Sequence, residues 1–459
     1  MSSNSLRQDR LVDKPILPTL LTLALPIMAS QVMHLLYNVA DTFWVGQLGP
    51  EPLAAISVSF PLIFFIISMA GGFAVAGVAL VSQYTGAEAG DEANRAAGQV
   101  IGFSVFLSIV FSALGLIFGR QILTLIGAGP DIIDEAWAFF RVMAAGIPLI
   151  FTFFVFSAIL QGIGDTVTPM KLRGGSIIFN MVIDPFLIFG WWIFPDLGVA
   201  GAAYATVISR LGATAIGIYL MFRGWRGLKL KPWHFIPDFG YIVRIIRIGI
   251  PAGVGQSALA VAMTVMTSIV AQFGTHPLAA FGVGNRILAL IRMPSMGMGR
   301  ATGVLVGQHL GADQPESATK TAWTGARVII SFMFVLALAF LALAPYIMRI
   351  FSDEPEVIRM GTDYLRFGGF AYMFLSVQQV LGGALEGAGR TVEKSFFLIL
   401  ALWGFQIPLS LFFSSVLDFG VYGIWVGVLI AKVLGVMAIL IWFSRGTWKQ
   451  KLVENGSGS

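Results

Sequence analysis

Long apolar runs, separated by short polar or charged stretches, dominate the sequence. A helix needs about 20 consecutive apolar residues to cross the hydrocarbon core of a bilayer, and in lipid a long apolar run satisfies its backbone as a helix. The pattern therefore predicts twelve transmembrane helices. They are expected at residues 16–46, 53–83, 96–119, 133–160, 168–194, 199–222, 241–273, 277–308, 322–351, 357–386, 394–416 and 419–443.

The second half of the chain repeats the first. Residues 23–31 align with 248–256, and 80–87 align with 305–312, both at an offset of 225 positions. Six helices in each copy make both halves enter the membrane in the same direction. We therefore expect an all-α membrane protein of two parallel six-helix repeats. This arrangement is typical of transporters whose solute route lies at or near the repeat interface.

A basic stretch at 223–243 separates the two repeats. The predicted division is an N-terminal tail at 1–14, an N-lobe at 15–222, the linker at 223–243, a C-lobe at 244–443 and a C-terminal tail at 444–459. The last residues, 455–459, resemble an artificial linker.

Basic residues are unevenly distributed between the two sides of the predicted membrane. Loops on the side of the termini include Arg7, Arg10, Lys14, Lys229 and Lys231, whereas the opposite loops hold little more than Arg120, Arg349 and Arg359. Because cytoplasmic loops are enriched in Lys and Arg, we expect both termini in the cytoplasm and the protein in the inner (plasma) membrane.

Composition agrees with membrane embedding and excludes several functions. Hydrophobic residues make up 57% of the 459 residues and charged residues 12%, against about 25% charged in soluble domains. The chain has no Cys, which excludes disulfides and thiolate metal sites, and its four His residues are not paired at ligand spacing. The net charge of +5 fits basic loops better than nucleic-acid binding. No HExxH or GxSxG motif is present, so we do not expect an enzyme.

Two acidic residues stand inside the predicted helices. Asp41 lies deep in the first and Asp184 midway along the fifth, where an ionisable side chain costs roughly 2.5–3.5 kcal/mol on insertion scales and marks a functional site by default. Polar neighbours three or four residues apart share one helix face. These are His34, Tyr37 and Asn38 with Asp41, and Asn180 with Asp184. On the sixth helix Ala202 and Thr206 also share a face, where Ala202 leaves a small gap beside the hydroxyl.

The repeat provides an internal control for this polar group. At the offset of 225, Asp41 aligns with Met266, and helix eleven has no acid in the stretch equivalent to helix five. Acids needed only for folding should occur in both lobes, so we favour a proton or cation site. Its oxygens suit a hard cation such as Na⁺ and come from Asp41, Asn180, Asp184 and Thr206. We expect H⁺ or Na⁺ as the coupling ion and no further cofactor.

Pro26 lies one-third along the first helix, where its missing N–H permits a bend. An ion bound at Asp41 is expected to bias this bend. Pro26 is therefore a candidate hinge.

The eighth helix carries basic residues instead of acids. Arg286, Arg292 and Arg300 lie in it, and their counterparts in the second helix are apolar. They either form a basic wall of the central cavity that faces anionic groups, or Arg300 snorkels to the cytoplasmic edge and the others pair with lipid phosphate or acids. The sequence leaves both interpretations open.

At these residues the chain resembles the multidrug and toxic compound extrusion (MATE) family, over residues 15–443. The motifs that carry the similarity are Leu25-Pro26 with Asp41 and Gly46, Leu53-Ala54-Ala55, Ser82-Gln83 with Gly86, Gln161-Gly162-Ile163-Gly164, Asn180 through Asp184-Pro185, and Gly201 through Thr206. The resemblance implies two six-helix bundles in a V that open alternately to either side. It also implies secondary active efflux of mainly cationic, hydrophobic drug-like molecules in antiport with H⁺ or Na⁺.

The resemblance also implies roles for individual residues. It implies a cation site at Asp41, Asn180, Asp184, Ala202 and Thr206, and a substrate-binding wall at Tyr37, Asn38, Asp41 and Asn180. The DinF-type prokaryotic branch is the most similar. Residues 251–262 lack the acid expected on helix seven of the NorM-type branch, and Gln378 and Gln379 stand where another acid is sought. We expect a monomer in the lipid bilayer.

The main alternative is a flippase of the same superfamily that moves lipid-linked precursors and grips their pyrophosphate with cavity arginines. Arg286 and Arg292 keep this alternative open, but helices one and two carry no Arg or Lys. A channel would not need a duplicated frame with acids in one lobe. Multidrug efflux is therefore the favoured function.

Overall fold

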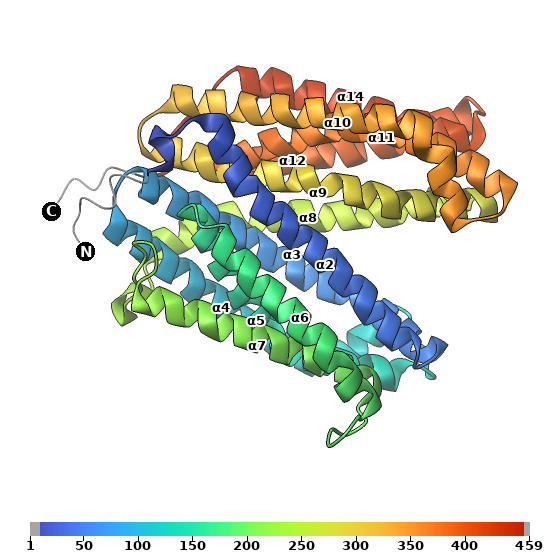
Figure 1. Cartoon of the computed structure of the whole chain (residues 1–459), viewed down its shortest axis with the longest axis horizontal. Coiled ribbons are helices and arrows are strands. Elements are labelled where there is room, and N and C mark those ends of the chain that lie inside the picture. The colour runs from blue at the N-terminus through green and yellow to red at the C-terminus, as the bar shows by residue number, and fades with distance from the viewer. Residues whose placement is uncertain (1–9, 454–459) are drawn as a thin grey trace. The chain divides into compact units, whose positions relative to one another are not determined.

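The chain folds into helices. The computed structural model describes residues 10–453, and no β-strand occurs among them (Figure 1). The elements are η1 (Leu11–Asp13), α2 (Ile16–Gly46), α3 (Pro50–Gly86), α4 (Gly90–Leu125), α5 (Ile133–Gly162), α6 (Val167–Phe189), α7 (Gly198–Arg223), η2 (Pro232–Phe235), α8 (Phe239–Ala271), α9 (Thr275–Gly311), α10 (Pro315–Phe351), α11 (Pro355–Gly387), α12 (Thr391–Ile399), η3 (Leu400–Gln406), α13 (Ile407–Leu411), η4 (Phe412–Val416) and α14 (Gly420–Ser444). The predicted all-α fold class is confirmed.

Among the described residues, ten helical segments are long and apolar enough to cross a membrane. One of them, Thr391–Val416, runs through α12, η3, α13 and η4, in which η3 and η4 are π-helical turns. The two other long helices, α9 and α11, are as long but more polar. α9 contains the three arginines Arg286, Arg292 and Arg300. The chain is thus a multi-pass membrane protein, and residues 10–453 contain the twelve long helical segments that the sequence predicts.

The backbone repeats its unusual conformations at the predicted offset of 225 positions. Gly49 and Gly274, which precede α3 and α9, have φ angles of 116° and 108°. Glu88 and Asp313, which follow the same two helices, have φ angles of 58° and 57°. Because residues other than glycine seldom adopt positive φ, the agreement identifies equivalent turns. The repeat seen in the sequence is therefore also a repeat of local structure.

The chain forms two compact units, and the boundaries between them fall within α2 and α8. Unit 1 contains Ala29–Gly253, and unit 2 contains the described parts of Gln8–Met28 and Val254–Glu454. The first half of α2 therefore belongs to unit 2 and its second half to unit 1, while α8 has the reverse assignment. Each division falls two or three residues after a proline inside the helix, Pro26 in α2 and Pro251 in α8.

Each half of α2 packs within its own unit. A Cβ atom on Gly297 of α9 would lie 3.2 Å from the carbonyl oxygen of Ala24, so the first half of α2 lies directly against α9. A Cβ atom on Gly174 of α6 would lie 2.9 Å from the sulfur of Met33, so the second half lies against α6. Glycine at these positions allows α2 to approach both helices closely.

Unit 1 is built around α5, whose aromatic side chains form much of its core. Phe151, Phe153 and Phe156 are fully buried, and α5 contacts α3, α4 and α7. A polar side chain on α6 or α7 that turns toward α5 therefore enters an environment with little water.

Unit 2 is built around a seam of glycines between α9 and α11, which lie side by side (Figure 1). Gly299 and Gly303 of α9 meet Gly383 and Gly387 of α11, so each helix presents two glycines four residues apart. A Cβ atom on Gly303 would lie 2.6 Å from the carbonyl oxygen of Gly383. Small residues with this spacing let membrane helices pack backbone to backbone.

Candidate ion and substrate site

A polar group lies among α2, α6 and α7 of unit 1. The hydroxyls of Tyr37 on α2 and Thr206 on α7 are hydrogen-bonded at 3.0 Å. On α6, the Asn180 amide donates to one carboxyl oxygen of Asp184 at 3.1 Å, across one helical turn. The spacing of four residues puts Asn180 and Asp184 on one face, and that face is buried.

Two carboxyl groups belong to this cluster. Asp184 is fully buried, and its second oxygen makes no hydrogen bond to the described part of the protein. Asp41 on α2 is half-buried, and one of its oxygens is likewise buried without a partner among residues 10–453. The charge of Asp41 acts on both Asp184 and Tyr37. Because a buried carboxylate without compensating partners is costly, this pair favours binding of a proton or a cation.

The other predicted site residues have different surroundings. Asn180 and Thr206 are buried beside the acids. Ala202, one turn before Thr206, is buried in an apolar cluster with Val45. Its methyl side chain contributes no ligand atom to the site. Asn38 is exposed, and the structure does not place it in the buried polar group.

The cluster offers a mixed set of oxygen ligands. Its carboxyls come from Asp41 and Asp184, and its neutral oxygens from Asn180, Thr206 and Tyr37. Among the residues that the structure describes, no group of three or more His, Asp or Glu is placed to hold a metal ion. Two carboxyls with neutral oxygens suit a proton or a hard monovalent cation better than a transition metal.

The model of the family MatE matches the chain twice, at residues 26–186 and 251–412. The two matches begin 225 positions apart (251 minus 26), which is the offset of the internal repeat. The chain belongs to the MatE family.

Relatives of this MatE protein match it along nearly its whole length. The probable multidrug resistance protein YoeA of Bacillus subtilis (strain 168) is 26% identical over 93% of this chain and 93% of its own. The FAD transporter of Shewanella oneidensis MR-1 is 27% identical over 92% of this chain and 93% of its own. A crystal structure of a MATE mutant has a TM-score of 0.90 at 23% identity, covering 98% of this chain and 99% of that one. This last likeness shows a shared fold.

Near the acids, the MatE protein has a basic layer, formed by Arg210 and Arg173, that the sequence analysis missed. Arg210 on α7 lies over the ring of Phe153 at 5.0 Å, and one of its guanidinium nitrogens is buried without a hydrogen-bond partner in the described chain. Arg173 on α6 lies over the same ring at 5.6 Å. The charges of both arginines act on His34, which stacks on Tyr37 with ring centroids 5.8 Å apart.

The signal for Arg210 was present in the sequence. It stands inside the predicted helix 199–222 and four residues after Thr206, so it shares that residue's face. Along α2 the polar residues run from His34 at the basic layer through Tyr37 to Asp41 at the acids. Seven residues of helix make this column about 10 Å long.

The three arginines predicted on the eighth helix, now α9, differ in their environment. Arg286 and Arg300 are exposed, whereas Arg292 is half-buried. The Nε of Arg292 is buried and has no hydrogen-bond partner among residues 10–453. Of the three, Arg292 is the one with a buried nitrogen that lacks a hydrogen-bond partner in the described chain.

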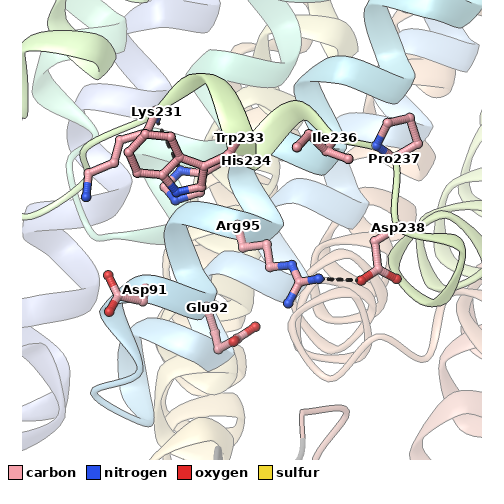
Figure 2. A pocket seen from close by; sticks show the side chains of 9 residues that line it. All are labelled: Asp91, Glu92, Arg95, Lys231, Trp233, His234, Ile236, Pro237 and Asp238. Carbon is pink, nitrogen blue, oxygen red and sulfur yellow. Dashed lines mark hydrogen bonds and ion pairs between the residues drawn. The ribbon is translucent and has the colours of Figure 1, made fainter.

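The linker forms a second polar site where it packs on the start of α4. Figure 2 shows this cavity of about 580 Å³, lined by Asp91, Glu92, Arg95, Lys231, Trp233, His234, Ile236, Pro237 and Asp238. An ion pair at 2.7 Å joins Arg95 to Asp238. Gln99 of α4 donates to the carbonyl of His234 at 2.8 Å. These contacts hold the linker against α4.

His234 is a titratable group at the contact between the linker and α4. Its side chain is buried, and its Nδ1 accepts a hydrogen bond from the backbone N–H of Lys231 at 3.3 Å. Burial, followed by the charge of Lys231, lowers the pKa of His234 from its usual value; Asp91 opposes this effect and Arg95 adds to it. Protonation of His234 therefore opposes the linker contact.

Proposed function

We propose that this MatE protein is a secondary active transporter that exports hydrophobic organic cations in exchange for H⁺ or Na⁺. The observation that carries the proposal is the pair Asp41 and Asp184, each of which has one buried carboxyl oxygen without a hydrogen-bond partner in the described chain. The name of the Bacillus relative, a probable multidrug resistance protein, supports organic solutes as the cargo. The names of the two relatives also support transport of organic solutes over movement of lipid-linked precursors.

Exchange follows if ion and drug share one site. When both carboxyls are ionised, their negative charges repel each other, most strongly where little water screens them. A proton, a Na⁺ ion or the cationic group of a drug relieves this repulsion. Because each of these ligands satisfies the same pair, binding of one disfavours the others. Such competition lets a gradient of the ion drive release of the drug.

The neutral members of the cluster position the acids. Asn180 holds one oxygen of Asp184 and leaves the other free for a ligand. The hydrogen bond between the hydroxyls of Tyr37 and Thr206 joins α2 to α7 beside Asp41. Either hydroxyl can turn its oxygen toward a bound cation, at the expense of that bond. Occupancy of the site would then change how α2 is held in unit 1.

Pro26 fits a hinge in this scheme. It lies in α2 just before the point where the helix passes from unit 2 to unit 1, and the hydrogen bond that proline cannot donate lowers the cost of bending there. We propose that ion binding at Asp41 biases this bend. We also propose a monomer in the inner membrane with both termini in the cytoplasm, as the distribution of basic residues predicts.

Efflux of ethidium from vesicles tests the proposal, with pH and Na⁺ gradients imposed separately. Asp41→Asn and Asp184→Asn preserve size and hydrogen bonding but remove the charge, and each is expected to abolish gradient-driven efflux. Asp134→Asn is the matched control, because Asp134 is exposed and paired with Arg120 at 2.7 Å. The control should export ethidium normally.

The gradient that drives efflux identifies the coupling ion. Normal gradient-driven efflux by both Asp41→Asn and Asp184→Asn would show that the site assignment is wrong. Movement of a fluorescent lipid-linked precursor analogue, without ethidium efflux, would instead support the flippase alternative.

A further inference from the structure

Unit 2 carries a buried lysine at the centre of its last helix. Lys432 is the only charged residue of α14 and stands midway between the ends of that helix. It is 7% exposed, and its ammonium donates to the side-chain oxygen of Gln406 at 2.8 Å. Charged residues inside membrane helices are rare, costly and usually paired. A neutral amide oxygen does not neutralise this charge.

The charge that acts on Lys432 is another cation, Arg292. Arg292 lies midway along α9, and its Nε is buried without a hydrogen-bond partner among residues 10–453. Its charge also acts on Tyr372 of α11. The two helices that carry these charges, α9 and α14, both contact α11, and they meet where the ring of Phe281 stacks on that of Trp425 at 5.9 Å. Two positive charges from separate parts of the chain therefore act on each other.

Within the described chain, no ion pair joins a carboxylate to Lys432 or Arg292. The acids of unit 2 that form ion pairs have other partners. These pairs are Asp13 with Arg10, Asp313 with Lys451, Glu356 with Arg359, Asp363 with Arg366, Glu386 with Lys394, and Glu393 with Arg390. The positive charge at mid-helix therefore has no compensating group in the protein that the structure describes.

The neutral groups near Lys432 are placed to orient it. Gln406 is the last residue of the π-helical turn η3, and π-helical turns are frequent at functional sites. Gln378 of α11 is 6% exposed and donates to the carbonyl of Phe397 at 3.4 Å. Its side-chain oxygen lies beside Gly435, about one turn after Lys432 on α14. The side-chain amides of Gln406 and Gln378 thus provide neutral polar groups near Lys432.

We propose that Lys432 and Arg292 form an anion-binding site in unit 2 that takes an oxyanion, either a carboxylate or a phosphate. The planar guanidinium of Arg292 can present two parallel donors to such a group, and the ammonium of Lys432 supplies a point charge. Gln406 is a positioning residue, since it fixes the ammonium. The oxyanion belongs to an organic solute or is free inorganic phosphate. This site does not depend on the proposed exchange at Asp41 and Asp184.

Binding can be measured without any ion gradient, so the result is separate from the test of efflux. The full chain is placed in phosphatidylcholine nanodiscs in chloride-free buffer, and benzoate and inorganic phosphate are titrated by calorimetry. Chloride and tetraethylammonium are titrated for comparison. We expect saturable binding of an oxyanion, much weaker binding of chloride and none of tetraethylammonium. Benzoate binding indicates an organic solute, and binding of phosphate alone indicates the free ion.

Variants assign the binding to the two cations. Lys432→Gln and Arg292→Gln should each weaken oxyanion binding about tenfold or more, the loss expected when a hydrogen bond to a charged group is removed. Arg286→Gln is the matched control, because Arg286 is an exposed residue of the same helix, and it should bind like the parent protein. Lys432→Arg keeps the charge and should keep measurable binding. If Lys432→Gln does not fold, Arg292→Gln and Lys432→Arg decide the question.

Two results would show that Lys432 and Arg292 do not form an anion-binding site, and a third would show that the bound anion need not be an oxyanion. One is the absence of saturable oxyanion binding to the folded parent protein, which would make Lys432 a structural partner of Gln406. The other is equal oxyanion affinity in the parent and in Arg292→Gln. Equal affinity for chloride and benzoate would overturn the oxyanion assignment.

Discussion

The glycine seam between α9 and α11 predicts a large cost for one added methyl group. In Gly383→Ala the new Cβ would overlap the carbonyl oxygen of Gly299 and lie 2.5 Å from its carbonyl carbon. Carbon atoms in favourable contact are about 3.5–4.0 Å apart, so the two helices must separate by roughly 1 Å. The obstructing atoms are backbone atoms, which no side-chain rotation can move. Overpacking typically costs about 1–3 kcal/mol, and we expect the upper end of that range.

The apparent melting midpoint of the purified protein measures this cost. For a unit of this size, each kcal/mol shifts the midpoint by about 2–4 °C, so Gly383→Ala should melt about 6–12 °C lower. Intrinsic tryptophan fluorescence in nanodiscs, recorded at one scan rate, gives the midpoint. Gly282→Ala is the matched control because it lies in α9 and its new Cβ would meet nothing within 4 Å. Alanine favours a helix over glycine, so the control should lose no stability.

Equal midpoints for Gly383→Ala and Gly282→Ala would refute the backbone-to-backbone packing. The same variant has a second readout, because α11 contacts both α9, which carries Arg292, and α14, which carries Lys432. A separation of these helices should also weaken oxyanion binding, whereas Gly282→Ala should leave it unchanged.

Three further predictions concern unit 1 and its linker. Tyr37→Phe removes the hydrogen bond to Thr206, which is worth about 0.5–1.5 kcal/mol. The affinity for ethidium in a binding titration should therefore change by up to about tenfold. An unchanged affinity would show that this hydrogen bond does not contribute to ethidium binding. Because the pKa of His234 is lowered in the folded protein, stability should be complete above about pH 6.5 and fall as the pH drops through that value. His234→Gln should flatten the dependence of the melting midpoint on pH, and identical slopes would contradict this role. Since the chain has no Cys, single cysteines report sidedness: in intact cells an impermeant maleimide should label Trp192→Cys but not Trp233→Cys, and the reverse pattern would invert the proposed orientation.

The amino-acid sequence by itself determined the helices, their duplication and the acidic part of the candidate site. Lipid leaves a long apolar run little choice but to form a helix, so run length alone located the twelve segments. The offset of 225 positions located equivalent turns, such as those at Gly49 and Gly274. A spacing of four residues was enough to place Asn180 and Asp184 on one face, because helical periodicity is a local property.

Helical periodicity does not determine how helices pack against one another, and only the tertiary structure decided that packing. The hydrogen bond of Tyr37 to Thr206 joins residues far apart in the chain, and the exposure of Asn38 depends on which face of α2 is covered. Lys432 and Arg292 lie on different helices, α14 and α9, and no spacing in the sequence indicates that these helices approach each other. Which side chains share an environment depends on how helices cross and how closely their backbones approach, and this is set by side-chain shape along the whole contact.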